Sequence, residues 1–128
     1  MKRAVTSDQT PSALGAYSPA VVSDGWVFVS GQAGFKADFT GFEEGNVAAQ
    51  TTMTLANIEQ LLLAAGSSLD DVVRTTCYLA DMDTFADFDT AYAAAFAAAG
   101  VEVLPARTTI GANISIGVEI DAVARVTS

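Results

Sequence analysis

The sequence predicts an α+β fold, in which one mixed β-sheet carries two helices on one of its faces. Apolar residues recur at helical spacing over 46–65 and again over 83–99, and short runs typical of strands lie around these two segments. The pair Asp24-Gly25 separates the first two strand-like runs, which is a strong hairpin signal. With 128 residues the chain has the length of one ordinary domain, so we expect residues 1–128 to form a single domain.

The first half of the chain is expected to contain a hairpin and a helix. Residues 6–18 are predicted to be an irregular lead-in because they include Pro11, Gly15 and several Ser and Thr residues. The runs 20–22 and 26–29 are predicted strands, followed by two glycines that allow a turn or a close approach to a ligand. Beyond a loop, a helix ending before Gly66 is indicated by the spacing of Ala48, Leu55, Ile58, Leu62 and Ala65.

The second half is expected to contain three strands and one helix. A strand over 71–80 is predicted to present one face formed by Val73, Thr75, Cys77 and Leu79. Asp83 is expected to cap the second helix, whose apolar stripe comprises Phe85, Phe88, Tyr92, Ala95 and Ala99. Strands over 107–112 and 118–126, joined by a turn, complete the order β-β-α-β-α-β-β.

The composition bears on the second face of this sheet. Hydrophobic residues make up 51% of the chain and charged residues only 16%. A high alanine content is one explanation. The other is that apolar surface is buried against further copies of the chain, and since both helices are expected on one face, we expect another subunit on the other.

Charge and residue type disfavour several classes of function. The net charge is −9 and the six basic residues form no cluster, so nucleic-acid binding and a ribonuclease role are not expected. Histidine is absent, which removes the commonest general base and most zinc sites, and no metal site is expected. The one cysteine, Cys77, is expected in the core. No signal peptide or apolar run of about 20 residues is found, so a cytoplasmic protein without membrane contact is expected.

Four residues stand out for chemistry. Arg107, held extended after Pro105, could bind a carboxylate through paired donors, although a surface ion pair is the alternative. Glu119 could transfer protons if its face of the last strand is buried at an interface; otherwise that face is simply hydrated. Tyr17 could line a ligand pocket or pack at its rim. Asp89 lies near the apolar stripe of the second helix, where solvent exposure is the ordinary expectation.

Seven segments together resemble the reactive-intermediate (enamine/imine) deaminase family, the Rid or YjgF-like proteins formerly named endoribonuclease L-PSP. The resemblance extends over essentially the whole chain. It rests on Gly15-Ala-Tyr-Ser, Val29-Ser-Gly-Gln32, Gln50-Thr through Asn57-Ile, the run from Ala64 to Thr76, Asp81-Met-Asp-Thr-Phe-Ala, Pro105-Ala-Arg-Thr and the run from Val118 to Ala124.

The resemblance implies a chorismate-mutase-like fold and a homotrimer with sites between subunits. It also implies deaminase chemistry without a cofactor: a small enamine such as 2-aminoacrylate becomes a 2-imino acid, water adds to the C=N carbon, and ammonia leaves a 2-keto acid. The implied roles are carboxylate binding by Arg107, pocket lining by Tyr17 and Ser30, close backbone approach at Gly31, and positioning or activation of water by Glu119.

Some positions depart from the family pattern. Thr109 stands where a cysteine is common, and Asp89 where asparagine is common; both are kept as candidate substrate-binding residues. The turn 113–117 is shorter than usual, which could reshape the rim of the pocket. Two alternatives therefore stay open: a paralogue acting on a larger unsaturated amino acid in a catabolic pathway, and a trimeric protein that binds keto acids or related metabolites without catalysis.

Overall fold

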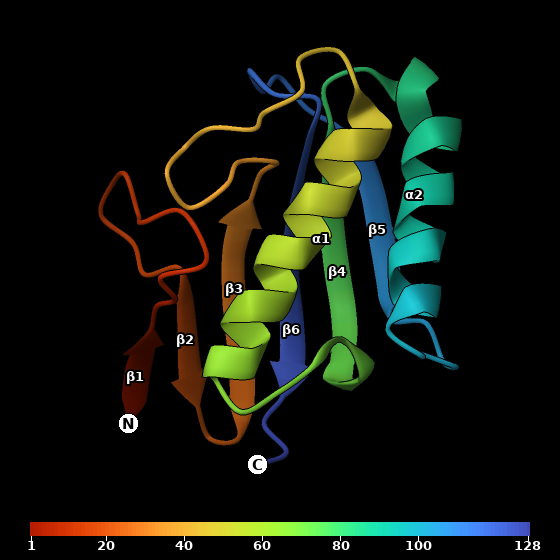
Figure 1. Cartoon of the computed structure of the whole chain (residues 1–128). Coiled ribbons are helices and arrows are strands. Elements are labelled where there is room, and N and C mark those ends of the chain that lie inside the picture. Colours follow the sequence, from red (N-terminus) through yellow and green to blue (C-terminus); the bar gives the residue numbers. More distant parts are fainter.

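A computed structural model describes all 128 residues, and it contains one six-stranded sheet with two helices on one face (Figure 1). This confirms the predicted α+β class with a mixed sheet. Short 3₁₀ turns at Leu69–Asp71 and Met82–Thr84 lead into the fourth strand and the second helix. In chain order the elements are β1 (Lys2–Val5), β2 (Ala20–Ser23), β3 (Trp26–Gln32), α1 (Val47–Ala64), β4 (Val72–Leu79), α2 (Phe85–Ala98), β5 (Ala106–Gly111) and β6 (Val118–Arg125).

The strands lie in the order β1-β2-β3-β6-β4-β5, so the last strand of the chain occupies the middle of the sheet. All neighbours are antiparallel except β4 and β5, which are parallel and are connected through α2. The predicted hairpin is confirmed at Asp24 and Gly25, whose φ angles of 52° and 81° suit a tight turn between β2 and β3. This topology leaves β1 and β5 as the two edge strands.

The strand β1 was not predicted. Lys2, Arg3 and Ala4 are exposed and only Val5 is buried, so the segment has no alternation of apolar and polar residues. Its pairing with β2 depends on backbone hydrogen bonds at the edge of the sheet, where charged side chains are common.

Both helices bury their apolar side against the same face of the sheet. α1 begins at Asn46, whose side chain accepts a hydrogen bond from the Ala49 N–H at 3.0 Å, and it ends before Gly66, which adopts a φ of 82°. Its most buried apolar side chains are at most 1% exposed: Leu55, Ile58, Leu61 and Leu62. α2 contributes Phe88, Tyr92 and Phe96. Neither helix is long and apolar enough to cross a membrane.

Three details of the predicted elements were wrong. Asp83 does not cap α2: the N-cap is Thr84, and the side chain of Asp81 caps the preceding 3₁₀ turn. Val73 is 43% exposed because an irregularity between Val72 and Arg74 places an extra residue in β4. Ala99 is exposed because α2 has already ended, and the neighbouring aromatic residue Phe96 is buried instead.

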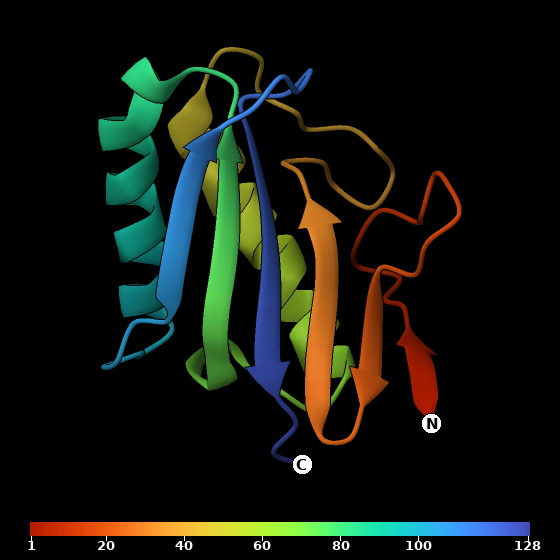
Figure 2. The ribbon, with the colours of Figure 1, turned by 180° about the vertical axis from the view of Figure 1, so that it is seen from behind.

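No helix covers the second face of the sheet (Figure 2). Large apolar side chains are exposed there, with Phe28 at 48%, Val73 at 43% and Ile110 at 44%. The face predicted to be left open by the helices is therefore open in the single chain.

Candidate functional site

A β-bulge near the end of β3 places Gly31 directly beside the carboxylate of Glu119. Val29 pairs with Ala122 but Gln32 pairs with Ile120, so β3 has one residue more than β6 in this stretch. The extra residue interrupts the alternation that buries Val27 and Val29, and Gly31 is exposed on the face that carries Glu119. A Cβ atom at Gly31 would lie only 2.9 Å from Cδ of Glu119, so only glycine leaves this carboxylate its present place.

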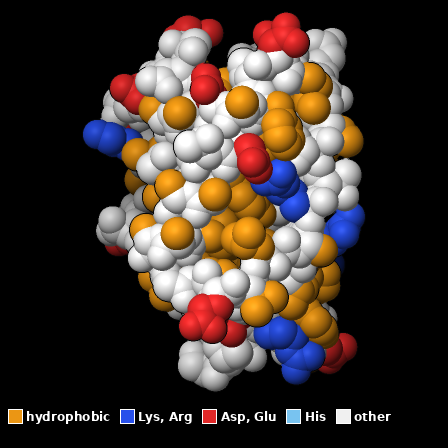
Figure 3. All heavy atoms as spheres, turned by 90° about the vertical axis from the view of Figure 1, so that its right-hand side faces the viewer, with side chains coloured by type: hydrophobic (Ala, Val, Ile, Leu, Met, Phe, Trp, Pro, Cys, Tyr) orange, Lys and Arg blue, Asp and Glu red, His pale blue; other side chains and the backbone are white.

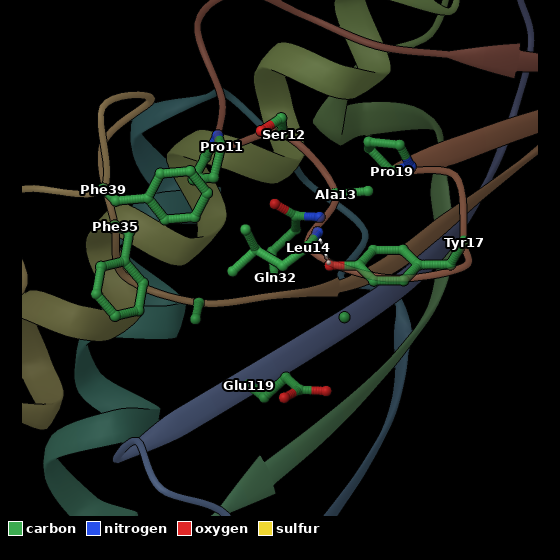
Figure 4. Close-up of a pocket in the computed structure, with 12 residues that line it drawn as sticks. Pro11, Ser12, Ala13, Leu14, Tyr17, Pro19, Gln32, Phe35, Phe39 and Glu119 are labelled. Atoms are coloured by element: carbon green, nitrogen blue, oxygen red, sulfur yellow. Dashed lines mark hydrogen bonds between the residues drawn. The ribbon is translucent and has the colours of Figure 1, made fainter.

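A hollow of about 240 Å³ opens beside Glu119. Its walls come from the loop before β2, the end of β3 and the loop after it, and Figure 4 shows Glu119 on β6 facing this space. Half of its lining residues are hydrophobic, and it has one ionisable carboxylate and no basic residue. The lining residues are Pro11, Ser12, Ala13, Leu14, Tyr17, Pro19, Gly31, Gln32, Ala33, Phe35, Phe39 and Glu119.

Tyr17, predicted as a pocket residue, does line this hollow. Its side chain is 52% exposed, and its hydroxyl accepts a weak hydrogen bond from the Leu14 N–H at 3.4 Å (Figure 4). Leu14 is itself 78% exposed, so the loop presents an apolar side chain and a phenol at the mouth of the hollow. Since the phenol is half-exposed, its donor hydrogen is available to a ligand.

The far wall of the hollow is fixed by the core of the protein. Asn57 of α1 is 3% exposed, and its amide donates to the carbonyls of Ala33 at 3.0 Å and of Phe35 at 2.8 Å. Phe35 stacks on Phe42 with ring centroids 4.6 Å apart. These contacts hold the loop after β3 against the helix, and they therefore set the position of the aromatic wall.

Ser30, the second polar residue predicted for the pocket, does not line the hollow in this chain. Its hydroxyl donates to the Ser18 carbonyl at 2.6 Å, and its backbone N–H donates to the Pro19 carbonyl at 2.9 Å. Both bonds tie β3 to the loop that carries Tyr17, so Ser30 supports the pocket wall from behind.

Arg107 and Asp89, by contrast, meet where the edge strand β5 lies beside α2. Nη1 of Arg107 donates to Oδ1 of Asp89 at 2.8 Å, in the only ion pair of the chain. The guanidinium carbon also lies 5.6 Å from the ring centre of Phe85, 5.2 Å from that of Phe88 and 4.8 Å from that of Tyr92. Figure 3 faces this side of the molecule and shows acidic and basic groups in contact beside hydrophobic side chains.

Thr109 belongs to this second group. It pairs in register with Cys77, as Arg107 does with Thr75, and both β4 residues are buried on the helix-covered face. The hydroxyl oxygen of Thr109 is buried without a hydrogen-bond partner. A buried hydroxyl of this kind is destabilising unless a partner supplies the missing bond.

The predicted catalytic pair is therefore divided within one chain. Arg107 lies on the helix-covered face of β5, whereas Glu119 pairs with Tyr78 on the open face. A strand places alternate side chains on opposite faces, so no side-chain rotation brings these two groups together through the sheet. The structure brings Tyr17, Gly31 and Glu119 to one place, and Arg107, Asp89 and Thr109 to another.

Burial raises the pKa values of two groups behind the Arg107 edge. It raises the pKa of Cys77 to about 11 and that of Tyr92 to about 12, although a hydrogen bond with Thr75 lowers both. The Tyr92 and Thr75 hydroxyl groups are 2.7 Å apart. Both groups stay neutral near pH 7, so they form an uncharged floor beneath Arg107. The prediction that Cys77 is a core residue is confirmed by its complete burial.

Several residues that line the hollow were not predicted from the sequence. Leu14, Phe35 and Phe39 line the hollow from loops, where apolar side chains have no periodic pattern to identify them. The available signal was the presence of aromatic residues in segments rich in glycine and proline, since such residues rarely stay exposed without a role.

Comparison with known proteins identifies the family. The sequence model of the family described as Endoribonuclease L-PSP matches residues 7–126. A RutC family protein of Pyrococcus horikoshii is 33% identical over 127 residues, covering 97% of this chain and 98% of that protein. The chain belongs to this Rid/YjgF family. The predicted membership of this family and the predicted α+β fold are thus confirmed.

Two further relatives bear on function. The 2-iminobutanoate/2-iminopropanoate deaminase of Rattus norvegicus is 35% identical over 92 residues, covering 72% of this chain and 67% of that protein. The crystal structure of Escherichia coli TdcF with bound serine matches with a TM-score of 0.90 and 26% identity, covering 98% of this chain and 99% of that one. Other relatives are named as mitochondrial and chloroplastic proteins, so a cytoplasmic location stays a prediction.

Proposed function

We propose that this protein hydrolyses small 2-imino acids, formed from enamines such as 2-aminoacrylate, to 2-keto acids and ammonia. The observation that carries the proposal is the Glu119 carboxylate at Gly31, set in a hollow with an exposed tyrosine. In this reaction water adds to the C=N carbon, and the resulting carbinolamine then releases ammonia as its C–N bond breaks. Glu119 accepts a proton from the attacking water and returns it to the leaving nitrogen.

The carboxylate of the substrate needs a cation that this hollow does not contain. We propose that Arg107 of a partner subunit supplies this cation. The β5 edge of the partner would then lie against the open face of the first subunit, next to Glu119. The exposed apolar residues on that face support contact with further copies, since such surface is ordinarily buried in an assembly. A closed trimer would use the same surfaces three times and would complete three equivalent sites.

The direct test is to measure keto-acid and ammonia release from freshly generated 2-aminoacrylate. The wild-type protein is expected to accelerate release well above the rate in buffer, and Glu119→Gln, which keeps the side-chain shape, is expected to remove the acceleration. Pyruvate binding to both proteins is the control, because it needs Arg107 and not a proton acceptor. A folded wild-type oligomer that gives no acceleration would contradict the proposal and favour binding without catalysis.

A second candidate function is the same hydrolysis acting on 2-imino acids with larger side chains. The hollow of about 240 Å³ has Leu14, Phe35 and Phe39 in its lining, more apolar surface than the methyl group of 2-iminopropanoate can cover. Imines generated from alanine, leucine and phenylalanine by an amino acid oxidase would separate the two candidates. A kcat/KM that rises with side-chain size supports the larger substrate, and one that falls steeply supports the smallest imines.

A further inference from the structure

The Arg107–Asp89 pair leaves specific atoms unused. Only Nη1 of Arg107 and Oδ1 of Asp89 take part in the pair, so Nε and Nη2 of the guanidinium and Oδ2 of the carboxylate have no hydrogen-bond partner in the chain. Asp89 is 49% exposed and Arg107 23% exposed, so both groups can be reached. The pair thus presents two donor N–H groups and one acceptor oxygen side by side.

The rings beneath the pair fix its position. Phe85, Phe88 and Tyr92 surround the guanidinium from below, and Tyr92 is tied to Thr75 through its hydroxyl. An arginine packed against three rings keeps few of its side-chain conformations, so its free donors keep one direction. Asp89 is fixed to the same guanidinium. The two charges therefore form a rigid dipole and not two independent surface charges.

A rigid dipole distinguishes ligands by their charge pattern. A simple anion binds the free edge of Arg107 but is repelled by Asp89, which already neutralises that cation. A molecule with a carboxylate and a positively charged nitrogen on the adjacent carbon meets a favourable partner at both ends. The protonated form of a 2-imino acid has this pattern, whereas the 2-keto acid that follows from it has only the negative charge.

We propose that Asp89 is a specificity-determining residue that makes this site a receptor for small zwitterions, with Arg107 binding the carboxylate and Oδ2 of Asp89 accepting a hydrogen bond from the charged nitrogen. The inference rests on the proposed function, because it assumes that Arg107 binds the substrate carboxylate. Its consequence is that the site holds the protonated imine more tightly than the keto acid. The product is then released because it has lost the group that Asp89 recognises.

The test compares two ligands of equal size in wild type and Asp89→Asn. Pyruvate has a carboxylate and an uncharged keto group, and L-alanine has a charged nitrogen in place of the keto oxygen. Titration calorimetry should show that Asp89→Asn tightens pyruvate binding and weakens L-alanine binding, each by about threefold to tenfold. Opposite changes cannot come from a general structural defect. If both affinities change in the same direction, or neither changes, the inference is wrong.

The control variant is Asp87→Asn, which removes one negative charge from the same helix without touching Arg107. Asp87→Asn should leave the ratio of the two affinities unchanged. If it changes this ratio as much as Asp89→Asn does, then net charge and not the Arg107–Asp89 pair sets the preference. Imine hydrolysis by the wild-type protein is measured in parallel. If the wild-type protein hydrolyses imines but Asp89→Asn leaves the ratio of the pyruvate and L-alanine affinities unchanged, this inference alone is wrong. If the wild-type protein neither hydrolyses imines nor binds either ligand, the proposed function is wrong and the inference with it.

Discussion

The hollow beside Glu119 and the Arg107–Asp89 pair differ in what each contains. At the hollow, a strand bulge, an acidic side chain and an exposed tyrosine surround an open space whose lining includes no cation. At the edge strand β5, an arginine rests on three aromatic rings beside an aspartate. The hollow has an acidic group without a cation, whereas the β5 edge has a cation that is paired with an acidic group. The comparison teaches that, within one chain, the hollow has no basic group to bind a carboxylate.

The largest expected effect comes from an experiment that tests whether Glu119 of one subunit and Arg107 of another act in the same site. In the Glu119→Gln and Arg107→Ala proteins, kcat/KM is expected to fall by about 100-fold or more. If they are unfolded together in equal amounts and refolded as mixed trimers, about a quarter of the sites should combine an intact Glu119 with an intact Arg107. Deaminase activity should return to about that fraction of the wild-type value. Mixed trimers that stay inactive would show that each site uses both residues from one chain.

The next effect concerns Arg107 alone. Arg107→Ala should lower kcat/KM for a 2-imino acid by about 100-fold, chiefly through KM, because the substrate loses its carboxylate partner. Thermal unfolding should show a loss of about 1 kcal/mol, since the guanidinium also packs on aromatic rings. Arg107→Lys keeps the charge and should recover only part of the affinity. A stability loss of several kcal/mol would mark Arg107 as a structural residue.

A smaller effect is expected at the hollow. Gly31→Ala should displace the Glu119 side chain and lower kcat by about tenfold, with little change in the melting temperature, because the neighbouring carboxylate can move aside. The same substitution introduced into Glu119→Ala should have no further effect, since the displaced group is already missing. Additive losses in the double variant would mean that Gly31 serves the backbone and not the carboxylate.

The last prediction concerns stability at high pH, and no effect on activity near pH 7 is expected from it. The pKa of Cys77 is about 11 in the folded chain against an ordinary value of 9.0, so below pH 9 both the folded and the unfolded states keep the proton. As pH rises from 9 toward 11 the unfolded thiol ionises first, and the free energy of unfolding should fall by something on the order of 2–3 kcal/mol. Denaturant unfolding from pH 8 to pH 11 should show a smaller loss in Cys77→Ala than in the wild type.

Local signals in the sequence were sufficient for much of the fold. The hairpin at Asp24-Gly25 and both helices depend on neighbouring residues, and their patterns predicted them within a few positions. β1 was missed because an exposed edge strand needs no apolar alternation. The burial of Asn57 in α1 was missed because its partners are loop carbonyls distant in sequence.

The sequence named candidate site residues but not their arrangement. Tyr17, Gly31 and Glu119 were three of these candidates, and the structure brings them to one hollow. The sequence could not show that Arg107 faces the helices, because the apolar residues of β5, Ala106 and Ile110, lie on the opposite face of the strand. Register between strands decides the face, and register depends on pairing with β4 and on the bulge in β3.

The amide of Asn57 has a consequence for how this protein can change. The loop that forms the aromatic wall of the hollow is held by hydrogen bonds from a buried side chain of α1, so that wall cannot be reshaped independently of the helix. The tyrosine loop on the other side is tied to β3 by the two hydrogen bonds of Ser30 and has no hydrogen bond to α1, so it is freer to vary. A lineage that acquires new substrates would therefore alter the loop before β2 first, and would keep the amide and the helix that carries it.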